Sequence, residues 1–172
     1  MHNTLLCLGA GISQVPLIHA AKRLNYSVIA VDKDFDAPGF ELANVSLNCS
    51  THDPHSIINA MESYFDQLSY SCCLKGIVNR SAGPPVISAA KIAKHFGIPS
   101  VPILSAEAIL QKNLLRQACD KFEIPTPKFH IINNNKLQEL PLTAFPLVVK
   151  PGLSLVGKSG VRIVDNQSQL LE

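Results

Sequence analysis

Short apolar runs alternate with amphipathic stretches at the start of the chain. Thr4–Leu8 is a continuous apolar run that ends in the glycine turn Gly9-Ala10-Gly11. Ser13–Leu24 then repeats apolar side chains at helical spacing, with Ser13 as the expected N-cap. Val28–Val31 is a second apolar run, which Asp32 ends. Strand, helix and strand within about 30 residues predict a βαβ unit and hence a parallel sheet.

The alternation of strand and helix patterns continues to about residue 104. Asp53-Pro54 has the sequence of an N-cap followed by proline in the first helical turn. The apolar face of that helix lies at residues 57–65. Further elements are expected as strands at 45–47 and 76–78 and as a helix at 84–96 that ends at Gly97. Residues 1–104 are therefore predicted to form a complete α/β domain with a Rossmann-like parallel sheet.

The pattern changes near Ser105, where a helix is expected to start. A second helix at 112–122 is followed by three short stretches with the composition of strands, at 129–132, 146–150 and 161–164. A last helix is expected to begin at 168. Residues 105–172 are therefore predicted to form a small α+β subdomain with antiparallel strands that stops partway.

Composition narrows the class of protein. Hydrophobic residues make up 47% of the 172 residues and charged residues 16%, which is a globular composition. The net charge of +2 comes without a dense basic run, so a nucleic-acid partner is not expected. No apolar stretch reaches the roughly 18 residues of a membrane span, and the N-terminus lacks the features of a secretory signal. The five cysteines have no framework spacing, which favours a reducing cytoplasmic location.

The first glycine turn partly matches the dinucleotide-binding pattern G-x-G-x-x-G. Gly9 and Gly11 follow a strand and precede a helix, and Asp32 ends the second strand as the ribose-binding acid would. The third glycine is replaced by Gln14. Three interpretations stay open: a tight turn that needs glycine for conformational reasons, a small-molecule site, or NAD binding.

A second glycine-rich segment, Gly152 to Ser159, matches the P-loop pattern G-x-x-x-x-G-K-[ST]. A P-loop opens a helix, whereas Gly160 is followed by the alternating β-branched residues of a strand. The pattern therefore argues against a P-loop fold. Two glycines, a lysine and a hydroxyl remain suitable for phosphate oxygens, and a plain hairpin loop is the alternative.

Two clusters have metal-ligating residue types but unsuitable geometry. Asp53, near Cys49, His52 and His55, is better explained as a helix start. The series Asp32-x-Asp34-x-Asp36 lacks the glycine and the final glutamate of a calcium loop. No metal site is predicted in the chain.

Four segments together resemble the N-terminal region of ATP-grasp enzymes, the family of carbamoyl-phosphate synthetase, biotin carboxylase and the purine-biosynthesis carboxylases. They are the opening βαβ unit, the loop at 34–44, Lys112 with Arg116 followed by Ile124-Pro125-Thr126-Pro127, and Pro146–Pro151 followed by the loop to Gly160-Val161. The resemblance covers the whole chain in order, and the last two segments form its most specific part.

The resemblance implies an ATP-phosphate site in the second part of the chain. Lys112 and Lys150 would contact the phosphates, and a loop between two antiparallel strands would close over them. The loop residues implied are Gly157, Lys158, Ser159 and Gly160. For both lysines, a solvated surface position is the alternative.

The resemblance also implies a site for the acceptor substrate at the carboxyl ends of the parallel strands. The residues expected there are Gly9, Gly11, Asp32, Arg80 and Ser81. Arg80 could hold a carboxylate or a phosphate. A surface arginine in a loop is the alternative.

The implied reaction is that of an ATP-dependent carboxylate–amine or carboxylate–thiol ligase, which activates a carboxylate as an acyl phosphate. Mg²⁺ is expected in the complete enzyme, but the family's metal-binding residues lie beyond the part that this chain resembles. We therefore expect no catalytic residue here, no activity of the chain alone, and possible homodimerisation of residues 105–172. Two alternatives are a non-catalytic small-molecule or nucleotide-binding module and an NAD-binding domain of an oxidoreductase.

Overall fold

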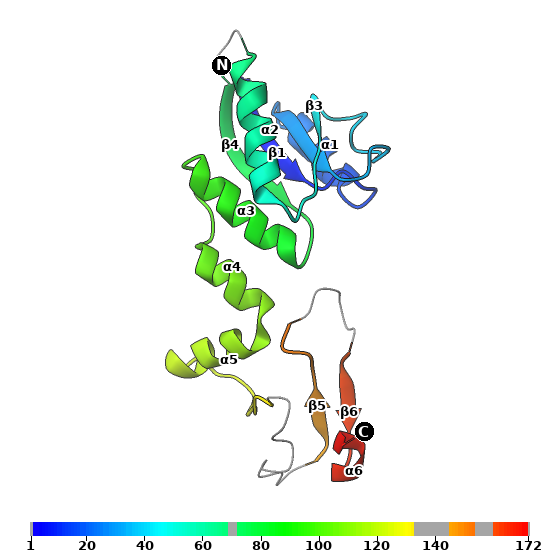
Figure 1. Ribbon diagram of the computed structural model, residues 1–172, viewed down its shortest axis with the longest axis vertical. Helices are drawn as coiled ribbons and strands as arrows, with labels where there is room; N and C mark the ends of the chain where they lie inside the picture. Colours follow the sequence, from blue (N-terminus) through cyan, green and yellow to red (C-terminus); the bar gives the residue numbers. More distant parts are fainter. Residues whose placement is uncertain (1, 69–71, 133–144, 154–159, 172) are drawn as a thin grey trace. The chain divides into compact units, whose positions relative to one another are not determined.

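The chain divides into two compact units, Met1–Ala106 and Glu107–Glu172, in a computed structural model (Figure 1). The structure describes residues 2–68, 72–132, 145–153 and 160–171. Each unit is described by itself below.

The first unit contains a four-stranded parallel sheet with strand order β3-β2-β1-β4 (Figure 1). Its strands are β1 (His2–Leu8), β2 (Ser27–Asp32), β3 (Val45–Asn48) and β4 (Cys72–Asn79). Its helices are α1 (Val15–Arg23), α2 (Pro54–Asp66) and α3 (Pro84–His95). The α/β class and the parallel sheet predicted from the sequence are confirmed.

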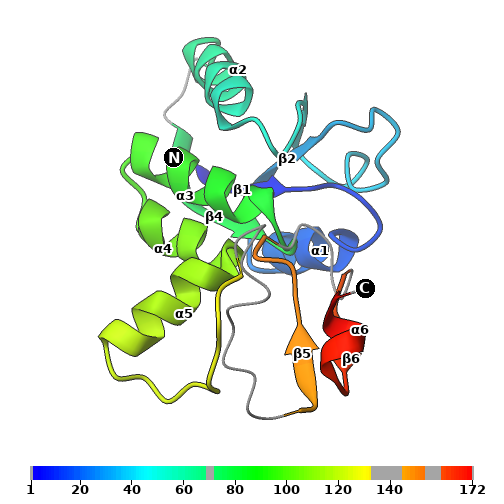
Figure 2. The ribbon, with the colours of Figure 1, turned by 60° about the horizontal axis from the view of Figure 1, so that its bottom comes forward.

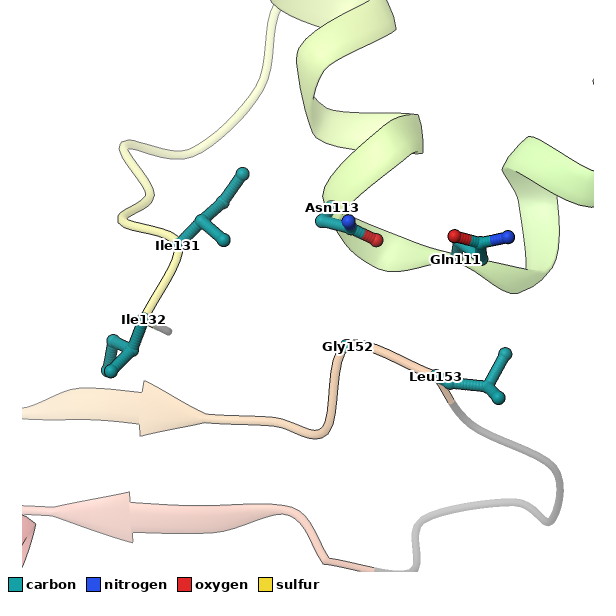
Figure 3. Close-up of a pocket in the computed structure, with 6 residues that line it drawn as sticks. All are labelled: Gln111, Asn113, Ile131, Ile132, Gly152 and Leu153. Carbon is teal, nitrogen blue, oxygen red and sulfur yellow. The ribbon is translucent and has the colours of Figure 1, made fainter. Parts of the chain in front are cut away.

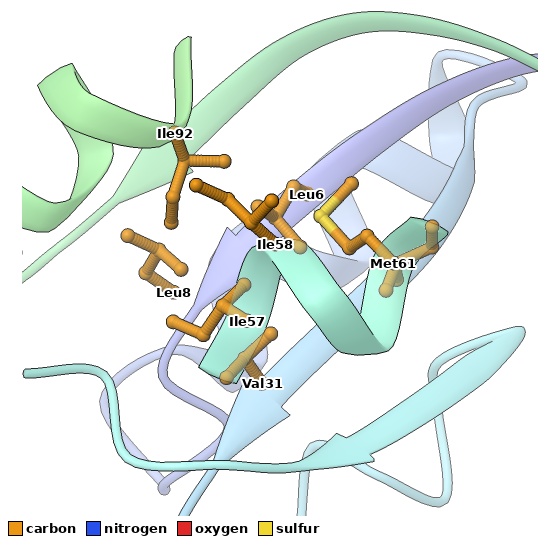
Figure 4. Packing of buried hydrophobic residues seen from close by; sticks show 8 residues of the cluster. Leu6, Leu8, Val31, Ile57, Ile58, Met61 and Ile92 are labelled. Carbon is orange, nitrogen blue, oxygen red and sulfur yellow. The ribbon is translucent and has the colours of Figure 1, made fainter. Parts of the chain in front are cut away.

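Alternate residues of the central strands pack on opposite faces of the sheet. On one face, Leu6 and Leu8 of β1 pack with residues of α2 and α3, including Met61 and Ile92 (Figure 4). On the other face, Cys7 of β1 packs with the buried residues of α1. Burial on both faces explains why the strands are continuous apolar runs instead of alternating patterns.

The two expected N-cap residues had different outcomes. The Asp53 side chain caps α2 as expected, accepting hydrogen bonds from the backbone N–H of His55 at 3.1 Å and of Ser56 at 3.2 Å. The expectation that Ser13 caps α1 is wrong, because that helix begins one residue later with Gln14 at the N-cap. The Ser13 carbonyl instead accepts a hydrogen bond from Arg80.

The second unit contains an antiparallel pair of strands (Figures 1 and 2). In the register of this pair, Val148 lies opposite Ile163. Helix α4 (Ile103–Leu110) contains the boundary between the units, and the remaining elements are α5 (Lys112–Lys121), β5 (Leu147–Val149), β6 (Arg162–Val164) and α6 (Gln167–Leu171). The expectation of a strand at residues 129–132 is wrong, since these residues pair with no strand in the described part of the chain.

Candidate functional site

The carboxyl ends of the parallel strands lie together at one end of the sheet, which is called the carboxyl edge below. Its central feature is the turn that follows β1. The Gly9 N–H donates to the Val31 carbonyl at 2.8 Å, so the turn stays attached to β2 after the ladder ends. The backbone of Gly9 has φ +98°, a conformation that favours glycine. This turn therefore requires Gly9 for conformational reasons, whatever it binds.

Asp32 holds the same turn with both of its carboxylate oxygens. Oδ2 accepts from the backbone N–H of Ala10 at 2.8 Å, and Oδ1 accepts from the backbone N–H of Asp34 at 3.1 Å. These bonds fix the turn after β1 and the loop after β2 to one another. The observed contacts of Asp32 are thus structural, and its contact with a substrate stays a prediction.

Gly39 provides a further contact to the turn, one that the sequence analysis did not identify. Its N–H donates to the Ala10 carbonyl at 2.7 Å, which brings the loop after β2 onto the turn. A Cβ atom at this position would lie 2.6 Å from that carbonyl oxygen. The close approach of two backbone segments explains why glycine stands here.

Gln14 and Arg80 link the turn to the end of β4. Gln14 Nε2 donates to the Arg80 carbonyl at 3.1 Å and to Ser81 Oγ at 3.4 Å. In return, the Arg80 guanidinium donates to the Ser13 carbonyl at 2.5 Å. From the sequence, Gln14 was noted only as the residue that replaces the third glycine of the pattern. Its side-chain contacts could not be predicted, because its partners lie 66 and 67 residues away.

These contacts bring the predicted substrate-binding residues together at the carboxyl edge of the sheet. Strand β1 lies between β2 and β4, and the chain leaves β1 toward β2 before it returns to β4. Open α/β sheets bind ligands at such a switch point, beyond the carboxyl ends of the strands. The five residues at this edge are Gly9, Gly11, Asp32, Arg80 and Ser81.

In the second unit, the start of α5 lies against the segment that follows β5. The Lys112 N–H donates to the Gly152 carbonyl at 2.8 Å, and Gln111 forms an antiparallel bridge with Leu153. Lys150, which directly follows β5, is exposed. The structure thus brings the backbone segments that carry the two predicted phosphate-binding lysines close together.

The two ends of the predicted phosphate loop also meet. Gly160 has φ +70°, and a Cβ atom there would lie 2.7 Å from Cγ of Pro151. The strand β6 that follows confirms the expectation that a strand, and not a P-loop helix, comes after the glycine-rich segment. Three predicted loop residues, Gly157, Lys158 and Ser159, lie outside the described residues.

A cavity of about 420 Å³ lies beside the contact between α5 and the segment after β5 (Figure 3). Two amide side chains and three aliphatic ones contribute to its wall, which is lined by Gln111, Asn113, Ile131, Ile132, Gly152 and Leu153. The guanidinium of Arg116 donates to Thr126 Oγ1 and so ties α5 to the proline-containing passage that leads to this wall. A mixed polar and apolar wall suits a small organic ligand.

No family model matches this chain. It is 30% identical over 171 residues to the formate-dependent phosphoribosylglycinamide formyltransferase of Prochlorococcus marinus strain MIT 9515, covering 97% of this chain and 41% of that relative. N5-carboxyaminoimidazole synthetase from Staphylococcus aureus, solved in complex with ADP, matches 98% of the chain with a TM-score of 0.76 at 13% identity and is covered to 43%. L-amino acid ligase from Bacillus licheniformis matches 99% with a TM-score of 0.70 at 22% identity and is covered to 41%.

The chain matches the N-terminal region of ATP-grasp enzymes. The resemblance predicted from the sequence is thereby confirmed. The chain spans about two fifths of the length of the curated relatives it matches, 41% in the first of them.

The residues that the structure describes do not fit a metal site. Within the described ranges, no three His, Cys, Asp or Glu side chains gather in a way that could hold a metal ion. We therefore assign no Mg²⁺ ligand among the described residues. Among the described helices, none combines the length and apolarity needed to cross a membrane.

Cys7, which lies one residue before the end of β1, should be chemically inert in the folded protein. Burial raises the pKa of its thiol to about 12, and Sγ donates to the Gly9 carbonyl at 3.3 Å. Because the thiolate is the reactive form, we expect alkylation with iodoacetamide at pH 8 to modify Cys49, Cys73 and Cys119 well before Cys7. Peptide mapping checks the order, and Cys7 should react only after denaturant is added. Early modification of Cys7 would contradict the burial of this strand.

Proposed function

We propose that this chain forms the N-terminal part of an ATP-dependent carboxylate–amine or carboxylate–thiol ligase. A substrate carboxylate oxygen attacks the γ-phosphorus of ATP, ADP leaves, and an acyl phosphate forms. An amine or thiol then attacks the acyl carbon, and inorganic phosphate leaves. The proposal is supported by the ATP-grasp relatives, one of which was solved with ADP.

The ATP phosphates are proposed to lie beside the start of α5 and the loop between β5 and β6. The observation that carries this assignment is the hydrogen bond from the Lys112 N–H to the Gly152 carbonyl at 2.8 Å. It places the backbone of Lys112 next to the segment that begins with Lys150. Two ammonium groups would there neutralise negative charge as the phosphoryl group is transferred. Gly157, Lys158, Ser159 and Gly160 are proposed to close over the phosphates.

The acceptor substrate is proposed to bind at the carboxyl edge of the parallel sheet. Gly9 and Gly11 form the turn at this edge, where Gly9 is buried and Gly11 is partly exposed, and Asp32 holds that turn in place. Arg80 is exposed and would pair with an anionic group of the substrate, while the Ser81 hydroxyl can donate or accept a hydrogen bond. Mg²⁺, when bound in the complete enzyme, would offset the negative charge of the phosphates.

Replacement of Lys150 tests the phosphate site. We expect Lys150→Ala to weaken ATP binding by the 172-residue chain about tenfold, because it removes a full positive charge from beside the phosphates. Lys112→Ala should act in the same direction. Binding is measured by titration with ATP, following the backbone amide signals of residues 111–113, 150, 152, 153 and 160.

Lys128→Ala is the matched control, because this lysine is also exposed in the second unit but lies outside the proposed site. It should bind ATP as the wild type does. If ATP shifts none of the followed signals, or if all three variants bind equally well, the proposed phosphate site is wrong.

A further inference from the structure

Helix α5 carries two positively charged residues on its less exposed face. Lys112, Arg116 and Cys119 follow one another at helical spacing on this face, and each is half-buried. Leu114 and Leu115, by contrast, are each 38% exposed. No residue of the helix is fully buried in the part of the chain that the structure describes. The placement of α5 therefore depends on its polar contacts more than on apolar packing.

The two cations of this face have no acidic partner among the described residues. Lys112 and Arg116 lie four residues apart, a spacing at which equal charges repel one another across one helical turn. No described Asp or Glu forms an ion pair with either of them. An anion bound beside this face would offset the repulsion, which fits the phosphates proposed to lie at the start of α5.

Arg116 is held by a side chain from outside the helix. Its guanidinium donates to Oγ1 of Thr126. Between residues 120 and 128, all of which the structure describes, Thr126 is the one residue that is not exposed. The passage after α5 therefore meets the helix at the point where Arg116 binds it.

The backbone turn after α5 leads the chain back along the helix. The Glu123 N–H donates to the Asp120 carbonyl at 3.2 Å, and the Ile124 N–H donates to the Cys119 carbonyl at 2.8 Å. These are the two bonds of a Schellman motif, in which Glu123 has φ +54°, a conformation that favours glycine. The helix thus ends in a defined turn, and the contact with Arg116 holds the chain that follows it.

One helical turn before Arg116, the helix is bonded to the segment after β5 (Figure 3). The Lys112 N–H donates to the Gly152 carbonyl at 2.8 Å. Lys150 stands two residues before that carbonyl. A shift of α5 along its axis, or a rotation about it, therefore moves Lys112 relative to Lys150.

We propose that Arg116 is a positioning residue of the phosphate site. Its hydrogen bond to Thr126 fixes the position and rotation of α5, and thereby sets the distance between Lys112 and Lys150 across the ATP phosphates. In this role Arg116 acts through Lys112 and does not touch the nucleotide. The proposal rests on the phosphate site proposed above and adds the residue that orients one of its two lysines.

ATP titration of the 172-residue chain separates positioning from direct contact with the phosphates. Arg116→Ala and Thr126→Val should each weaken ATP binding about tenfold, because each removes the same hydrogen bond. Thr126→Val keeps the guanidinium charge and the shape of the side chain, whereas Thr126→Ser keeps the hydroxyl and should bind ATP as the wild type does. Lys121→Ala removes one positive charge from the far end of α5 and should also bind as the wild type does.

Hydrogen exchange gives a second measurement that does not depend on ATP. In Arg116→Ala and Thr126→Val, the Lys112 amide should exchange about tenfold faster than in the wild type, because its bond to the Gly152 carbonyl weakens. In Thr126→Ser the rate should stay at the wild-type value. The amides of β5 and β6 should keep their rates in all variants, and an equal rise there would show a role in stability alone.

Two results would overturn the proposal. If Thr126→Val binds ATP as the wild type does while Arg116→Ala binds it more weakly, Arg116 contacts the phosphates directly. If the Lys112 amide exchanges at the wild-type rate in both variants, Arg116 does not position it. Should the wild type bind no ATP, the phosphate site itself fails, and the exchange rate of Lys112 still decides whether Arg116 positions this residue.

Discussion

Gly39→Ala should lower the free energy of unfolding of the first unit by about 3 kcal/mol. The added Cβ would lie 2.6 Å from the carbonyl oxygen of Ala10 and 2.7 Å from Cδ1 of Ile18. The first of these atoms is backbone, and the second belongs to a side chain that is fully buried under the sheet. Neither can move aside cheaply, so the loop after β2 must retreat and the hydrogen bond from Gly39 to Ala10 weakens.

Hydrogen exchange of the β1 amides measures this change, because their protection reports the unfolding of the sheet to which they belong. Gly152→Ala is the matched control, because no atom of the described residues lies within 4 Å of a Cβ built there, and the substitution should leave β1 protection unchanged. Equal protection of the wild type and Gly39→Ala would show that the two backbone segments do not pack as tightly as described.

The turn after β1 is the part of the site that the sequence described best. Gly9 and Gly11 stand between a continuous apolar run and a helical repeat, and both signals are local in the chain. The positive φ of Gly9 agrees with the tight turn inferred from that pattern. Asp53 is a similar case, since its carboxylate caps residues only two and three positions ahead.

Contacts between distant segments could not be read in the same way. Nothing near Gln14 in the sequence indicates that its amide bonds to residues 80 and 81, because the parallel sheet brings β1 and β4 together. Ser13 has the residue type of an N-cap, but the Arg80 guanidinium binds its carbonyl and the helix begins one residue later. Tertiary packing overrides local preference at such positions.

The second unit shows the limit of pattern reading for strands. The alternation at residues 161–164 predicted β6, and its register with β5 places Val148 opposite Ile163 on one face. Residues 129–132 have similar β-forming composition but pair with no strand in the described part of the chain. β-propensity reflects a fit to neighbouring strands, so composition without a partner does not make a strand.

Leu6→Ala should have the largest effect of the single substitutions considered, lowering the free energy of unfolding of the first unit by about 3–4 kcal/mol. Leu6 is fully buried in the central strand and packs in the cluster that contains Met61 and Ile92 (Figure 4). Its partners in the sheet are Ile29 on β2 and Ile77 on β4. Because strands flank it on both sides and helices cover that face, the surroundings have little freedom to close the cavity.

Protection of the β1 amides against hydrogen exchange again gives the change in free energy. Leu24→Ala is the matched control, since Leu24 is 70% exposed at the end of α1 and the same truncation there should cost less than about 0.5 kcal/mol. A loss of similar size in both variants would contradict the assignment of Leu6 to the core. The expected difference matters for the site, because β1 ends in the turn that carries Gly9 and Gly11. A weakened central strand should therefore loosen the edge where the acceptor is proposed to bind, even though Leu6 itself contacts no ligand.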